Sequence, residues 1–120
     1  MDQKTVLETI TDILMPFWPL CKKYTEQDKQ EAKRAFIDAL IIVTNSKPPK
    51  IHEDVYGNGF TMVFLHQLRM IYKCVKSGDY LCGCHLLSDT LDLYWTEDLN
   101  DGLKCLLEEI KRKEGLHTFL

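Results

Sequence analysis

The segment Cys82-Gly83-Cys84-His85 has the residue types and spacing best suited to chemistry. Two thiols beside an imidazole can bind zinc or exchange a disulfide. Residues two apart on a helix point about 200° apart around its axis, so Cys82 and Cys84 face opposite ways there. Cys82, His85 and Asp89 instead fall within about 60° of one another. We therefore take these three as candidate ligands for zinc or another divalent metal.

This candidate metal site has a simpler competing interpretation. A closed zinc site needs a fourth ligand, for which the chain offers Asp92 on the next turn or His66 on a neighbouring helix, and an open site keeps a water there. Alternatively, the two cysteines fill gaps in a core, the histidine lies at a surface or an interface, and Asp89 is solvated. This second interpretation needs no cofactor, and it is the one we favour.

The sequence contains no diagnostic catalytic motif. It has no nucleophile elbow, no glycine-rich phosphate loop and no HExxH helix. His52, Glu53 and Asp54 lie in the irregular segment of residues 45–58, where they would line a pocket, although an exposed polar loop explains them more simply. We therefore assign no catalytic residue and expect a protein that is not an enzyme.

The charge balance disfavours nucleic acid as a partner. Fifteen basic and eighteen acidic residues give a net charge of -3, so the chain lacks the general phosphate attraction on which most nucleic-acid binding depends. The charge is also uneven: residues 79–109 contain eight acids and only Lys104 as a base, which gives this segment -7 and leaves +4 elsewhere. Such an acidic surface is either solvated or suited to a basic partner.

Cysteine content and hydropathy indicate a cytoplasmic protein. The five cysteines are an odd number, and the N-terminus lacks the pattern of a secretory signal, so reduced thiols are expected rather than a disulfide framework. No apolar run approaches the roughly 18 residues of a membrane span. We expect no membrane association.

Apolar spacing predicts a helical chain. Helices are expected over residues 2–14, Glu26–Thr44, 60–76 and 80–95, with a last helix that ends before Gly115. Thr25 and Asp28 form a variant of the capping box, and the Gly78-Asp79 pair ends one helix and starts the next as an antiparallel hairpin. Thr96 favours a break between the last two helices, although their apolar stripe would also suit a single long helix.

These elements predict an all-α fold, a four- to five-helix antiparallel bundle that forms one domain over residues 1–120. The second, third and fourth helices are expected at the centre, with the first and last at the flanks. Ile37, Ile41 and Ile42 form a second apolar face on the Glu26–Thr44 helix, and such surplus apolar surface favours a homodimer or another protein partner.

Our leading functional hypothesis is a non-enzymatic cytoplasmic protein-interaction or regulatory module that self-associates through an apolar surface edged by the acidic segment. The alternative is a small metal-binding or metal-dependent protein that uses Cys82, His85 and Asp89.

Overall fold

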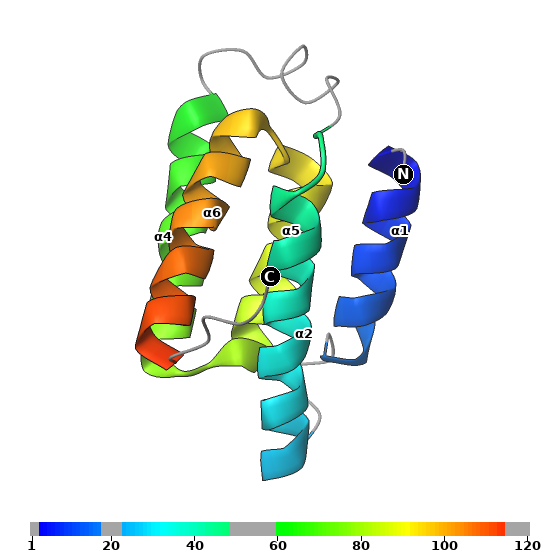
Figure 1. Ribbon diagram of the computed structural model, residues 1–120, viewed down its shortest axis with the longest axis vertical. Coiled ribbons are helices and arrows are strands. Elements are labelled where there is room, and N and C mark those ends of the chain that lie inside the picture. The colour runs from blue at the N-terminus through cyan, green and yellow to red at the C-terminus, as the bar shows by residue number, and fades with distance from the viewer. Residues whose placement is uncertain (1–2, 18–22, 49–59, 115–120) are drawn as a thin grey trace.

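The computed structural model describes residues 3–17, 23–48 and 60–114. These residues form α1 (Gln3–Leu14), the short 3₁₀ helix η1 (Met15–Phe17), α2 (Glu26–Thr44), α4 (Phe60–Ser77), α5 (Tyr80–Tyr94) and α6 (Glu97–Glu114). Successive α-helices alternate in direction along the long axis, so that α4 and α6 run parallel to each other (Figure 1). The predicted all-α bundle is confirmed, and the four longer helices match their expected positions closely.

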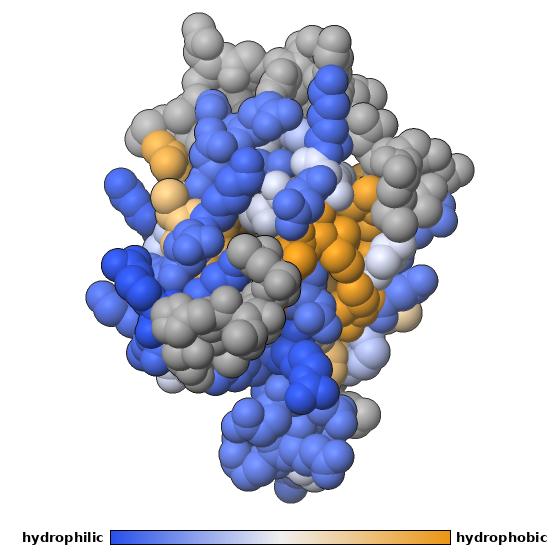
Figure 2. All heavy atoms as spheres, viewed as in Figure 1, coloured by the Kyte–Doolittle hydropathy of each residue, from blue (hydrophilic) through white to orange (hydrophobic). Residues whose placement is uncertain are grey.

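A capping box starts α2 at the predicted place. Thr25 Oγ1 accepts a hydrogen bond of 3.1 Å from the backbone N–H of Asp28, and Asp28 Oδ2 accepts one of 2.9 Å from the N–H of Thr25. The two bonds satisfy backbone donors that have no partner within the helix, and an N-cap of this kind contributes about 1 kcal/mol. The first turns of α2 project beyond the other helices and are hydrophilic (Figure 2).

The α4/α5 hairpin depends on two residues. Gly78 adopts a φ of 80°, the left-handed conformation that glycine tolerates best, and the following Asp79 N–H donates a 2.8 Å hydrogen bond back to the Cys74 carbonyl. The Asp79 side chain then caps α5 by accepting a 3.1 Å bond from the Cys82 N–H. This arrangement reverses the chain within two residues, as the sequence predicts.

The centre of the bundle consists of α2 and α5, with α1, α4 and α6 packed around them. The last helix contributes more core than expected, since α6 buries five large aliphatic side chains: Leu99, Leu103, Leu106, Leu107 and Ile110. Among the described side chains of α4, only Ile71 is buried. The expectation that residues 60–76 lie at the centre is therefore wrong, because an apolar stripe shows which side of a helix faces inward but not which helices surround it. The last helix lies at a flank as expected.

The second apolar face of α2 is largely covered by the chain itself. Ile37 is buried, and Ile41 and Ile42 are partly buried against the core. Apolar surface is still visible between α1 and α2 (Figure 2). The fold thus covers much of the apolar surface that leads us to expect a homodimer. The homodimer stays a prediction.

A buried polar cluster fixes the junction between α5 and α6. The Trp95 indole Nε1–H donates a 2.8 Å hydrogen bond to Asn100 Oδ1, and Asn100 Nδ2 donates a 3.0 Å bond to the Ser46 carbonyl just after α2. Thr96 Oγ1 caps α6 by accepting from the Leu99 N–H at 3.2 Å. The predicted break at Thr96 is confirmed, and the alternative of one fused helix is wrong.

No helix in the described part of the chain combines the length and the apolar character needed to cross a membrane.

We predict that Asn100→Ala lowers the free energy of unfolding by about 2–4 kcal/mol, because it leaves the buried Trp95 N–H and the Ser46 carbonyl without their partner. Urea unfolding followed by circular dichroism measures this change. The matched control is Asn45→Ala, which removes an exposed 2.7 Å bond to the Ile41 carbonyl and should cost about 1 kcal/mol or less. Equal losses in the two variants would contradict the role assigned to the buried cluster.

Candidate functional site

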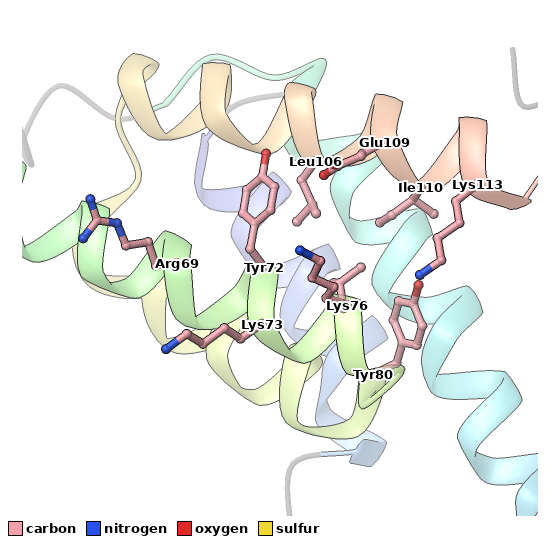
Figure 3. A pocket seen from close by; sticks show the side chains of 10 residues that line it. Arg69, Tyr72, Lys73, Lys76, Tyr80, Leu106, Glu109, Ile110 and Lys113 are labelled. Carbon is pink, nitrogen blue, oxygen red and sulfur yellow. The ribbon is translucent and has the colours of Figure 1, made fainter.

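A hollow of about 490 Å³ lies between α4 and α6, beside the start of α5 (Figure 3). We call it the α4/α6 groove. Ten residues line it: Arg69, Tyr72, Lys73, Val75, Lys76, Tyr80, Leu106, Glu109, Ile110 and Lys113. Its volume falls within the range of about 300–1,000 Å³ that is typical of ligand-binding pockets.

A close approach of α4 to α6 limits the groove at one end. A Cβ atom placed on Gly102 would come within 2.5 Å of Leu68 Cδ2, so only a residue without a side chain fits there unless Leu68 moves. The Tyr72 hydroxyl donates a 3.4 Å hydrogen bond to the Gly102 carbonyl across the same contact. Burial raises the pKa of Tyr72, and Cys105 and Glu109 raise it further. The hydroxyl therefore keeps the proton that it donates.

The floor of the groove is apolar. Leu106 and Ile110 of α6 are buried, and Val75 of α4 is half-buried against the same core. The Tyr80 ring packs edge-on against Phe36, with the ring centroids 5.5 Å apart. These packed side chains form a surface that can bury an apolar group of a partner.

The rim of the groove is basic. Arg69, Lys73, Lys76 and Lys113 contribute four positive charges and Glu109 one negative charge, whereas the whole chain carries -3. Basic residues are favoured in the last turn of a helix because they complement its macrodipole. Since α4 and α6 run parallel, their last turns lie at the same end of the bundle, and that places Lys76 and Lys113 on one hollow.

Two of these bases are directed over the hollow itself. Lys76 and Lys113 extend into the space between α4 and α6, whereas Arg69 and Lys73 point away from α6 (Figure 3). The ion pairs formed by the described side chains join Lys29 to Glu26, His85 to Asp89 and Lys111 to Glu108, and include neither Lys76 nor Lys113. Among the described residues, neither ammonium group is therefore held in an ion pair, and both lie beside Glu109 on the same hollow.

The structure brings together only part of the predicted metal site. His85 Nε2 lies 3.4 Å from Asp89 Oδ2 one turn later. Cys82 instead lies near Cys74 on α4, and burial, followed by the neighbouring Cys82 thiol, raises the pKa of Cys74 to about 12. Within residues 3–17, 23–48 and 60–114, no three His, Cys, Asp or Glu side chains form a group suited to a metal ion. A site that uses Cys82, His85 and Asp89 stays a prediction without geometric support.

Metal analysis of freshly purified protein tests that prediction. If the three side chains bind zinc, each chain carries one equivalent, which Asp89→Ala removes and Asp101→Ala retains. Asp101 is a suitable control because it is also an exposed acid and is not among the candidate ligands. A metal content that is the same in both variants would exclude this ligand set.

Five of the eight acids in residues 79–109 lie away from the groove rim. Asp89, Asp92, Glu97, Asp98 and Asp101 are all exposed around the end of α5 and the first turn of α6, whereas Glu109 lines the groove. The bases that line the groove come from the later turns of α4 and α6, at the other end of these helices. The groove is thus a different surface from the expected one edged by acids, and that expected surface stays a prediction.

Other candidates lie outside the described residues. These are Cys21, the loop residues His52, Glu53 and Asp54, and the tail of residues 116–120.

Sequence reasoning missed the groove because its parts look ordinary in isolation. The pattern of residues 60–76 places Arg69, Lys73 and Lys76 opposite the apolar stripe, as on any solvated helix. The sequence shows only that two helices both end in basic residues. These residues indicate a shared basic rim only when α4 and α6 are known to be parallel neighbours.

We predict that iodoacetamide at pH 8 modifies Cys105 at least tenfold faster than Cys84 in the folded protein. Cys105 is exposed, whereas burial raises the pKa of Cys84 to about 12. Only about one thiol in 10,000 with that pKa is ionised at pH 8, and the thiolate is the reacting form. Peptide mass spectrometry measures both rates, and unfolding in urea should remove the difference. Equal rates in the native state would contradict the described burial.

No family model, curated protein or solved structure matches this chain.

Proposed function

We propose that this chain is a protein-interaction module and that its α4/α6 groove binds an apolar, acidic segment of a partner protein. The observation that carries the proposal is the groove itself, an apolar hollow of about 490 Å³ whose rim holds four bases and one acid. The four described cysteines are free thiols, which supports a reducing compartment such as the cytoplasm as part of the same proposal.

The apolar floor provides the affinity. Burying one leucine-sized side chain contributes about 1.5–3 kcal/mol, and the floor offers Val75, Leu106 and Ile110 for such contacts. The groove runs between two parallel helices, so a helical partner segment lying along it would meet α4 on one side and α6 on the other. Helix-in-groove recognition of this kind uses apolar anchors three or four residues apart.

The basic rim provides the preference for acids. Lys76 and Lys113 extend over the hollow (Figure 3), where carboxylates beside an apolar anchor would reach them. Attraction between opposite charges raises the association rate and disfavours basic partners. Because the chain as a whole is negative, a strongly acidic partner without an apolar anchor would be repelled elsewhere on the surface.

We predict that the protein binds a fluorescein-labelled helical peptide with leucines on one face and glutamates on the other. The Lys76→Glu/Lys113→Glu variant should weaken this binding about tenfold or more, because it reverses both charges at the hollow. Fluorescence anisotropy measures the affinity. The same peptide with lysine in place of glutamate should bind the native protein at least tenfold more weakly.

The matched control is Lys47→Glu/Lys104→Glu, which changes the net charge by the same amount at two exposed bases that do not line the groove. Binding that this control weakens equally, or that does not distinguish the acidic from the basic peptide, would refute the proposal. Circular dichroism and urea unfolding of both variants verify that the fold is retained.

A further inference from the structure

The last turn of α5 carries a surface complementary to the groove. Leu93 is 49% exposed, and the exposed carboxylates of Asp89 and Asp92 lie on the same helix. Asp89 Oδ2 also lies 3.4 Å from His85 Nε2. Residues 89, 92 and 93 fall within about 100° around the helix axis, so they share one face. We call these three residues the α5 tip. It combines one apolar side chain with two acids, which is the chemistry that the groove suits.

Leu93 differs in its charged surroundings from another exposed apolar side chain on the bundle. Met70 of α4 is 38% exposed, but it lies between Arg69 and Lys73 in the sequence, whose charges match the sign of the groove rim. A basic groove would repel the surface around Met70 and attract the surface around Leu93. Charge therefore favours the α5 tip over the surface around Met70. Met15 is 58% exposed and follows the exposed acids Glu8 and Asp12, so charge does not exclude it, and a Met15 variant is needed as a control.

One copy cannot fill its own groove with its own tip. The groove includes Tyr80 at the first turn of α5, whereas Leu93 lies 13 residues further along the same helix, a rise of about 20 Å. Because α5 is a continuous rigid helix within the bundle, the two surfaces stay at opposite ends. Contact between them requires a second molecule.

We propose that the α4/α6 groove of one copy receives the α5 tip of a second copy. Leu93 would enter the apolar hollow, and Asp89 and Asp92 would meet Lys76 and Lys113. This inference rests on the proposed function and names the partner as a second copy of this chain. The contact joins two different surfaces of the protein. It therefore forms either a closed dimer, in which each copy inserts its tip into the groove of the other, or an open chain of molecules.

Sedimentation equilibrium of the full chain tests this contact. The native protein should show an average mass above the 14.0 kDa of one chain, rising with concentration and falling at high salt because the charge contacts are screened. Two variants should each remain at the mass of one chain. The groove variant is Lys76→Glu/Lys113→Glu, and the tip variant is Asp92→Asn/Leu93→Ser.

Mixing the two variants provides the decisive measurement. The groove variant still has an intact tip, and the tip variant still has an intact groove, so an equimolar mixture should form a complex of twice the single-chain mass and nothing larger. The control is Met15→Ser, which removes a 58% exposed side chain outside the tip and should leave the association of the native protein unchanged.

The outcomes separate this inference from the proposed function. A native protein that stays at one chain mass at every concentration, yet binds the acidic peptide, overturns the second-copy inference and leaves the groove function standing. Self-association that survives in the groove variant, or a mixture that forms no complex, also overturns the inference. A native protein that neither self-associates nor distinguishes the peptides overturns both.

Discussion

The buried hydrogen bonds of Asn100 determine how the second half of the chain sits on the first. Asn100 is 2% exposed and Trp95 is fully buried, so neither side chain can exchange its bonds for water without opening the core. Through Asn100 Oδ1 the cluster fixes the reversal from α5 to α6, and through Nδ2 it ties this reversal to the backbone just after α2. The second bond joins residues 54 apart in the sequence and so holds the start of α6 against the end of α2, where the two helices also pack together.

The groove is a consequence of that topology. Two chain reversals, at Gly78-Asp79 and at Trp95-Thr96, separate α4 from α6, so these two helices run in the same direction side by side. Each helix ends in basic residues, which complement the macrodipole of that helix alone. The parallel arrangement then gathers those local charges around one apolar hollow. A bundle in which α4 and α6 ran in opposite directions would separate the same lysines by the length of a helix.

Local signals in the sequence predict most of the fold. The capping box at Thr25, the left-handed Gly78 and the caps at Asp79 and Thr96 all act within four residues, so they can be recognised without tertiary information. The arrangement of helices depends on contacts far apart in sequence. The apolar stripes of α4 and α6 look alike, and only the packed structure shows that α6 buries five large aliphatic side chains whereas the described part of α4 buries Ile71. For the same reason the sequence groups Cys82 with His85 and Asp89 on its own helix, whereas its thiol neighbour is Cys74 on the preceding helix α4.

Gly102 leaves room for the Leu68 side chain where α4 contacts α6. A Cβ at position 102 would come within 2.5 Å of Leu68 Cδ2, the end of a flexible side chain, so a larger residue there would require Leu68 to adopt another position. Neither residue lines the groove, whose lining residues lie further along both helices. A change at position 102 would therefore reach the groove only through Leu68, while every lining side chain stayed the same.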